Sequence, residues 1–159
     1  MTRVHNDILC DIDDGKFVIL ILLDLSSTFD TVDPSILLNR LKHRFGVKNK
    51  ALAWLRSYLL KRSQFVYIEN ERSSSRGLPS GVLQGSVLGP LLYSMYVAPL
   101  AEIIEKHNMS YHFYADDTQI YLSFRPSDKA EPDLSRFRIE LCIQDTNCWM
   151  MANKLKLTE

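Results

Sequence analysis

Hydrophobic and polar positions in the first third of the chain predict a buried strand followed by a helix. Residues 17–23 form an uninterrupted apolar run that is rich in β-branched residues. Such a run predicts a central strand that is buried on both faces. Asp33-Pro34 then provides an N-cap followed by proline at the first helical position, and Gly46 is placed to end the helix.

The middle of the chain continues with shorter patterns. Leucines at positions 52, 55 and 59 mark a second helix. Residues 64–69 are typical of a strand, and the serine-rich segment from 73 to 79 is typical of a loop. Residues 87–107 are apolar at helical spacing, and we expect Pro99 to kink that helix or to end it early.

The last third predicts a β-hairpin and a long helix. Residues 111–114 and 118–124 are expected to be two strands joined across Ala115-Asp116-Asp117. A helix over about 132–152 is expected to bury an apolar stripe, and another strand is expected to start at 155–159. The predicted stripe consists of Leu134, Phe137, Leu141 and Trp149. Strands and helices are mixed without strict alternation, which favours an α+β fold.

Composition excludes several classes of protein. The 159 residues are 46% hydrophobic and 24% charged, which is typical of one globular domain and not of a disordered or collagen-like chain. No apolar stretch approaches the roughly 20 residues that cross a bilayer, and the N-terminus lacks the apolar core of a signal peptide. Three cysteines without a CxxC pair argue against a disulfide framework. We therefore expect a single domain, 1–159, inside the cell, in the nucleus or the cytoplasm, and not on a membrane.

The formal net charge of zero conceals a gradient along the chain. Residues 1–39 carry a net charge of −5, residues 40–76 carry +8, and residues 77–159 carry −3. A basic middle third can serve as a surface for a polyanion such as nucleic acid. The same charges can also simply solvate helix faces.

Three carboxylates are candidate metal ligands. Asp24 directly follows the apolar run, and Asp116 and Asp117 are adjacent at the expected hairpin tip. Asp24 can instead end the strand in solvent, and paired aspartates are common in turns. If the hairpin lies beside the strand, the three carboxylates converge at one end of a sheet. Such a cluster suits hard divalent cations, and two ions can clamp both oxygens of a phosphoryl transfer.

A glycine-rich segment precedes the long apolar pattern. Glycines at 81, 85 and 89 allow backbone to approach a ligand closely. The segment lacks the Gly-Lys-Ser/Thr ending of a phosphate-binding Walker loop. Taken alone, the segment is therefore a weak indication of a nucleotide site.

Four segments together resemble a known family. Residues 22–33, 80–92, 113–121 and 149–157 are similar, in order and in spacing, to the palm motifs of reverse transcriptases from non-LTR (LINE-type, jockey-like) retrotransposons. The resemblance implies an α+β fold in which a palm-like antiparallel sheet packs on helices, with fingers and thumb incomplete. Leu83 stands where the family usually has proline, and Pro34 stands where histidine is common.

The resemblance also implies a metal site. Asp24 and Asp116 would hold two Mg²⁺ or Mn²⁺ ions, Asp117 would complete the acidic cluster, and the carbonyl of Leu25 would be an additional ligand. The implied reaction is attack by a primer 3′-hydroxyl on the α-phosphate of a dNTP.

Four further residues receive roles by the same resemblance. Phe29 would be the steric gate against a ribose 2′-hydroxyl, although ordinary packing is its alternative. Gln84 and Gly85 would lie against the incoming nucleotide and the template, and Tyr114 would approach the primer end. The implied partners are an RNA template, a DNA primer and dNTPs. Two alternatives are a catalytically inactive retrotransposon remnant and a recruited nucleic-acid- or protein-binding module; a palm-like nucleotide cyclase fits the segment from Gly81 to Pro90 less well.

Overall fold

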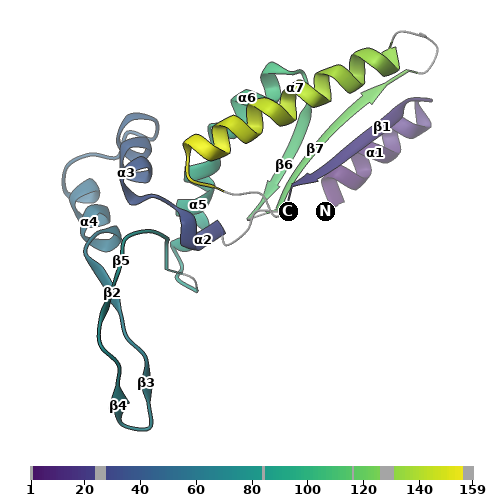
Figure 1. Cartoon of the computed structure of the whole chain (residues 1–159). Coiled ribbons are helices and arrows are strands. Elements are labelled where there is room, and N and C mark those ends of the chain that lie inside the picture. Colours follow the sequence, from purple (N-terminus) through teal and green to yellow (C-terminus); the bar gives the residue numbers. More distant parts are fainter. Residues whose placement is uncertain (1, 24–27, 84, 116, 126–130, 156–159) are drawn as a thin grey trace. The chain divides into compact units, whose positions relative to one another are not determined.

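The computed structural model describes residues 2–23, 28–83, 85–115, 117–125 and 131–155, which pack as two compact units (Figure 1). The first, here called the sheet unit, comprises residues 1–26, 97–152 and 156–159. The second, here called the basic unit, comprises residues 27–96 and 153–155. The chain is a mixture of helices and antiparallel strands, as the α+β prediction requires.

The sheet unit is built on three antiparallel strands in the order β1-β7-β6. Its strands are β1 (Phe17–Leu23), β6 (Ser110–Tyr114) and β7 (Asp117–Phe124), and its helices are α1 (Thr2–Asp13), α6 (Leu100–Lys106) and α7 (Glu131–Ala152). Successive residues Ile120, Tyr121 and Leu122 of β7 are all buried, so both faces of the central strand are covered. Helix α1 contacts β1, and the Tyr121 hydroxyl donates to Asp7 of α1 at 2.7 Å. Helix α6 contacts β6, and α7 contacts both α6 and β7 (Figure 1).

The prediction of a strand over 17–23 is confirmed, but its central, fully buried position is wrong. Among the strands that the structure describes, β1 lies at the edge of the sheet and β7 lies in the centre. The side chains of Phe17, Leu20 and Leu22 are 58%, 43% and 68% exposed. An apolar run predicts a strand, but it does not determine how many strands and helices of this unit cover that strand.

The basic unit is a set of helices followed by a β-hairpin and a further helix. The helices are α2 (Thr28–Thr31), α3 (Pro34–His43), α4 (Asn49–Leu59) and α5 (Gly89–Val97), of which Val97 belongs to the sheet unit. The N-cap prediction is confirmed, because the Asp33 carboxylate accepts from the backbone N–H groups of Ser35 at 2.8 Å and Ile36 at 3.0 Å. Gly46 follows the end of α3 at φ +68°.

The hairpin lies between α4 and α5, and its strands are β2 (Arg62–Gln64), β3 (Tyr67–Ile68), β4 (Glu71–Arg72) and β5 (Arg76–Leu78). Strand β2 pairs with β5, and β3 pairs with β4. Glu69 and Asn70 both have positive φ at the turn, as a two-residue hairpin turn of type I′ requires. The expected strand over 64–69 is therefore half of a hairpin, and the serine segment expected to be a loop belongs mainly to the returning half.

The predicted helix over 87–107 is divided at Pro99, as expected. Helix α5 ends at Val97, and α6 starts at Leu100. The predicted β-hairpin is also confirmed, with Tyr114 paired to Asp117 next to the turn. The sequence patterns did not predict helices α1 and α2. Within the described residues, no helix is both long enough and apolar enough to cross a membrane.

The last predicted helix is confirmed as α7, but its predicted buried stripe is wrong. Leu134, Phe137 and Leu141 are 56%, 58% and 37% exposed, and Trp149 is the one member of the predicted stripe that is partly buried. The buried positions of α7 are Ser135, Cys142, Thr146 and Met150. These positions are spaced by seven, four and four residues, so they also form a helical stripe. Within the sheet unit, the neighbouring elements therefore cover the face of α7 whose side chains are mostly smaller. The strand expected at 155–159 falls largely on 156–159, outside the described residues.

Candidate active site

The ends of two sheet elements meet where the predicted acidic residues occur in sequence. Strand β1 ends at Leu23, which pairs with Thr118 of β7, and Tyr114 of β6 pairs with Asp117. The last residue of β1 and the β6–β7 turn therefore lie at the same end of the sheet (Figure 1). Asp24, Leu25 and Asp116 lie outside the described residues.

Two predicted site residues at this end of the sheet are described. Asp117 is the first residue of β7 and is exposed, and Tyr114 is the last residue of β6 and is 70% exposed. Ala115 follows Tyr114 with φ +52°, which starts the tight turn. No cluster of three His, Cys, Asp or Glu side chains that could hold a metal occurs within the described ranges, which omit Asp24 and Asp116. Convergence of all three aspartates therefore stays a prediction.

Phe29 lies in the short helix α2 of the basic unit. Its ring is partly buried and packs against Tyr93 of α5, with 5.3 Å between ring centroids. The same residue lines a small hollow of about 150 Å³ together with Leu83, Gly85, Ser86, Gly89 and Pro90. Phe29 and Gly85, which belong to different sequence motifs, therefore line the same hollow. Gln84 lies outside the described residues.

Backbone hydrogen bonds hold the glycine-rich segment against the Phe29 segment. The Gly81 N–H donates to the Val32 carbonyl at 2.8 Å, and the Val82 N–H donates to the Phe29 carbonyl at 2.7 Å. Gly81 has φ +88°, and a Cβ atom there would lie 3.0 Å from the Asp30 Cα atom. Only glycine tolerates both the left-handed backbone and this close approach.

A compact turn then leads into α5. The Ser86 hydroxyl donates to the Leu83 carbonyl at 2.6 Å and accepts from the Gly89 N–H at 3.0 Å. Gly85 has φ +78°, and a Cβ atom on Gly89 would lie 3.0 Å from the Leu83 carbonyl oxygen. The glycines of this segment therefore let the backbone turn tightly beside the hollow, and their close approach to a ligand stays a prediction.

A polar network that local sequence patterns did not predict joins the first and the last of the motif segments within the basic unit. Lys154 forms an ion pair with Asp33, and the Tyr96 hydroxyl donates to the Asn153 carbonyl at 2.6 Å. The Arg40 guanidinium donates to the Tyr96 carbonyl and to the Asn153 side-chain oxygen, and it lies 4.7 Å from the centroid of the Tyr96 ring. No local pattern could have paired residues so far apart in sequence.

Burial and charge shift the acid–base properties of this network. Burial alone would raise the pKa of Asp33, but hydrogen bonds from Lys154 and from the backbone of Ile36 and Ser35 outweigh it, so the pKa lies below its usual value. Burial raises the pKa of Tyr96 and lowers the pKa of Arg40. At neutral pH, Asp33 is therefore ionised and Tyr96 keeps its proton.

Comparison with known proteins agrees with these motifs. The chain is 31% identical over 140 residues to the "Probable RNA-directed DNA polymerase from transposon BS" of Drosophila melanogaster, covering 85% of this chain and 15% of that protein. It is 32% identical over 124 residues to the "RNA-directed DNA polymerase from mobile element jockey" of the same organism, covering 74% of this chain and 13% of that protein. The chain thus spans about one seventh of the length of these relatives.

The fold agrees with a solved telomerase structure. A structure of apo telomerase from Candida tropicalis, truncated from its C-terminal domain, matches 100% of this chain and 35% of its own, with a TM-score of 0.65 at 16% identity. This likeness shows a palm-like polymerase fold. The sequence profile described as "Reverse transcriptase (RNA-dependent DNA polymerase)" matches residues 6–159. This match covers nearly the whole chain, so the protein belongs to the reverse transcriptase family.

Proposed function

We propose that this chain contributes the palm of an RNA-directed DNA polymerase, which extends a DNA primer on an RNA template by transfer from dNTPs. The supporting observation is the strand register of the sheet unit. Leu23 pairs with Thr118, and Tyr114 pairs with Asp117. The described residues that flank Asp24 and Asp116 in sequence therefore lie at one end of the sheet.

In this proposal, Asp24, Asp116 and Asp117 hold two divalent cations, and the Leu25 carbonyl adds a ligand. Carboxylate and carbonyl oxygens are the ligands that Mg²⁺ and Mn²⁺ prefer. Bound there, the ions would supply charge neutralisation at the attacking and leaving oxygens of phosphoryl transfer. The exposed position of Asp117 at the start of β7 leaves its carboxylate accessible to such an ion.

The remaining site residues orient the substrates. Phe29 is the steric gate that excludes a ribose 2′-hydroxyl, and its packing on Tyr93 restricts the motion of its ring. Gln84 and Gly85 lie against the nucleotide and the template, where the absence of a side chain at Gly85 allows a close approach. Tyr114, which is 70% exposed beside the β6–β7 turn, contacts the primer end. Catalysis then depends mainly on positioning and on charge stabilisation.

The test is primer extension on an RNA template by the purified 159-residue chain, with Mn²⁺ first and then Mg²⁺. We expect extension by the wild type and none by Asp24→Asn, because the variant removes a metal-binding carboxylate while its size stays nearly the same. Circular dichroism must show that both proteins are folded. Absence of extension by the folded wild type would contradict an active palm in this chain and would favour the inactive remnant or the recruited binding module.

A further inference from the structure

The hairpin between α4 and α5 is a solvent-exposed ribbon. All side chains from Ser63 to Gly77 are exposed. They include four consecutive large apolar residues, Phe65, Val66, Tyr67 and Ile68, which are 47% to 65% exposed. A contiguous apolar surface of this kind is unusual on a soluble domain unless it meets a partner. We refer to residues 61–78 as the ribbon.

The two strand ladders of the ribbon are out of step. Gln64 pairs with Arg76, and Tyr67 pairs with Arg72, so two residues on one strand face three on the other. This is a β-bulge, which changes the direction in which nearby side chains point. The bulge borders a hollow of about 420 Å³ that is lined by Gln64, Phe65, Val66, Ser73, Ser74 and Arg76. Its volume falls within the roughly 300–1,000 Å³ of small-molecule pockets.

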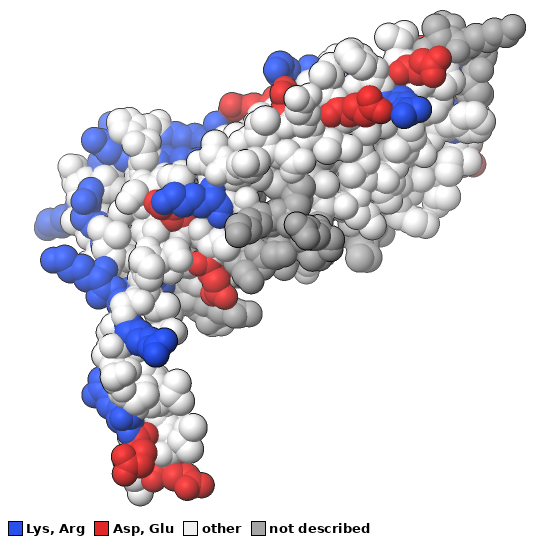
Figure 2. Space-filling model, viewed as in Figure 1, with Lys and Arg blue, Asp and Glu red and all other residues white. Residues whose placement is uncertain are grey.

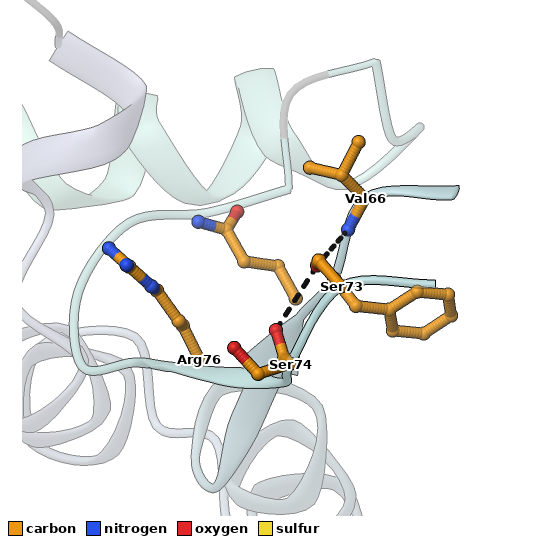
Figure 3. Close-up of a pocket in the computed structure, with 6 residues that line it drawn as sticks. Val66, Ser73, Ser74 and Arg76 are labelled. Carbon is orange, nitrogen blue, oxygen red and sulfur yellow. Dashed lines mark hydrogen bonds between the residues drawn. The ribbon is translucent and has the colours of Figure 1, made fainter. Parts of the chain in front are cut away.

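Polar groups around the hollow fall into two sets. The Ser73 hydroxyl accepts from the Val66 N–H at 2.9 Å, which links the two halves of the hairpin, and donates to the carbonyl of the adjacent Ser74 at 3.1 Å (Figure 3). The side chains of Gln64, Ser74 and Arg76 make no hydrogen bond or ion pair with any other residue that the structure describes. An amide, a hydroxyl and a guanidinium are therefore available to a ligand beside an aromatic ring.

The aromatic ring is already part of a cation–π stack. The Arg72 guanidinium lies 3.8 Å from the centroid of Phe65, and the Phe65 side chain is still 47% exposed. Stacked aromatic and guanidinium planes are the surfaces on which unpaired nucleic-acid bases stack.

The charge of the ribbon is divided between its two ends. Lys61, Arg62 and Arg76 lie at the stem, whereas Glu69 and Glu71 lie at the turn and beside it, together with Arg72. Figure 2 shows further Lys and Arg side chains over the helices beside the stem. The basic unit as a whole carries eleven Lys and Arg against four Asp and Glu, a net charge of +7. The stem therefore attracts a polyanion more strongly than the turn does.

We propose that the hollow beside the bulge of the ribbon binds single-stranded RNA, with a base against Phe65 and a backbone phosphate on Arg76. Gln64 and Ser74 supply hydrogen bonds to the base edge or to the sugar. The occupant is a single strand because only unpaired bases offer a free face for stacking.

Charge and chemistry favour RNA over a protein partner. The described residues that line the hollow supply a guanidinium and neutral donors but no carboxylate, which suits phosphate oxygens and base edges. The inference rests on the proposed function in one respect, because that function supplies RNA as the polyanion that the chain meets.

The test measures binding of a fluorescein-labelled 12-nucleotide single-stranded RNA to the 159-residue chain by fluorescence anisotropy. EDTA is present throughout, and KCl is varied. We expect Phe65→Ala to weaken binding about 5- to 150-fold, the range for losing one stacked base. Arg76→Gln should weaken binding and make the slope of log K against log[KCl] shallower by about 0.7, as expected for one lost phosphate contact to a single strand. Phe65→Leu keeps a large apolar side chain and removes the aromatic ring, so it tests stacking without removing most of the side-chain volume.

Two matched variants control for general effects. Phe137→Ala removes an aromatic side chain that is 58% exposed on α7, and Arg125→Gln removes an exposed charge from the sheet unit. Both should bind RNA within about twofold of wild type. The inference is overturned if the wild type binds no RNA, or if the ribbon variants bind as the wild type does. It is also overturned if the two controls lose as much affinity as the ribbon variants.

Self-association decides between RNA and protein as the occupant. Sedimentation velocity of the wild type and of Phe65→Ala, without RNA, would reveal an oligomer that depends on the ribbon. Such an oligomer, together with RNA binding that is unchanged by Phe65→Ala, would overturn the inference. Because the assay contains EDTA and needs no chemistry, loss of polymerase activity leaves its outcome unaffected. Conversely, if the wild type extends primers while Phe65→Ala and Arg76→Gln bind RNA as the wild type does, this inference is refuted and the proposed function is not.

Discussion

At the residue scale, Gly81 is the position where the glycine-rich segment meets the backbone of the Phe29 segment. Its N–H bonds to Val32, and its missing Cβ leaves room for the Asp30 and Phe29 backbone, each approached to within about 3.1 Å of where a Cβ would be. The sequence showed a glycine at this position but not the reason for it. That reason depends on a contact with a segment about 50 residues away.

Gly81→Ala should therefore destabilise the protein by more than the left-handed backbone alone explains. The expected loss of unfolding free energy is about 1–2 kcal/mol from the positive φ, plus a further cost from the backbone contact. Gly46→Ala is the matched control, because Gly46 has φ +68° but no atom within 4 Å of the position that a Cβ would take. Urea denaturation of both variants measures the difference, and equal losses would show that the close contact has no energetic consequence.

Asp33 combines an N-cap for α3 with an ion pair to Lys154. Its pKa in the folded protein lies below the usual value, so ionised Asp33 stabilises the fold above the unfolded carboxyl pKa of about 4. That contribution is lost as the pH falls through the lower folded pKa. Asp33→Asn, which keeps a capping side chain, should be less stable than wild type at pH 7, and the difference should shrink below about pH 4.

Asp33→Ala separates the two roles. Loss of the cap should lower the unfolding free energy by about 1 kcal/mol relative to Asp33→Asn, with little dependence on pH. Denaturation curves of the wild type and both variants between pH 3 and pH 7 provide the measurement. A deficit of Asp33→Asn that stays constant over this range would contradict the role of the charge.

At the element scale, α7 shows how a helix can be predicted correctly and its buried face incorrectly. Leu134, Phe137 and Leu141 form the more apolar stripe, but the structure buries Ser135, Cys142, Thr146 and Met150. Small side chains let a helix approach its neighbours closely, and α7 packs on both α6 and β7. Hydrophobicity along one helix therefore does not decide which stripe its neighbours cover.

The two faces of α7 should respond differently to truncation. Met150→Ala should lower the unfolding free energy by about 2–5 kcal/mol, because Met150 is 1% exposed and its removal leaves a cavity. Leu134→Ala should change it by no more than about 0.5–1 kcal/mol, since Leu134 is 56% exposed. Chemical denaturation of the two variants compares the stripes directly. The reverse order would restore the stripe that periodicity favoured.

At the scale of the whole molecule, the formal charges separate between the two units. The sheet unit carries a net charge of −7 and the basic unit one of +7, although the chain sums to zero. The predicted metal-binding aspartates all belong to the sheet unit, and the ribbon belongs to the basic unit. Metal binding and RNA binding are therefore expected to respond to different substitutions.

Divalent metal should stabilise the chain if the three aspartates converge. At a concentration ten times its dissociation constant, an ion that binds only the folded state adds about 1.4 kcal/mol, which raises Tm by about 3–6 °C. We expect Mn²⁺ to produce such a rise in a thermal melt of the wild type, and Asp116→Asn to abolish it. Asp13→Asn, an exposed acid of the same unit, should leave the rise unchanged. An undiminished rise in Asp116→Asn would refute the metal site at this position.

Local patterns alone determined much of this protein. The run at 17–23, the Asp33 cap, the break at Pro99 and the hairpin around Ala115 were all predictable, because each depends on neighbouring residues and on backbone geometry. The order of the four motif segments likewise indicated the reverse transcriptase family, and the match over residues 6–159 confirmed it.

Contacts between segments far apart in sequence determine which faces are buried and which segments meet. The edge position of β1, the buried face of α7, the link from Arg40 and Tyr96 to Asn153, and the bulge of the ribbon all depend on partners far away in sequence. Burial is a property of the surroundings of a side chain rather than of its type, so one chain's pattern of apolar residues leaves these choices open. Strand register, in turn, brought the end of β1 beside the β6–β7 turn, which is why the sheet can serve as a platform for the proposed site.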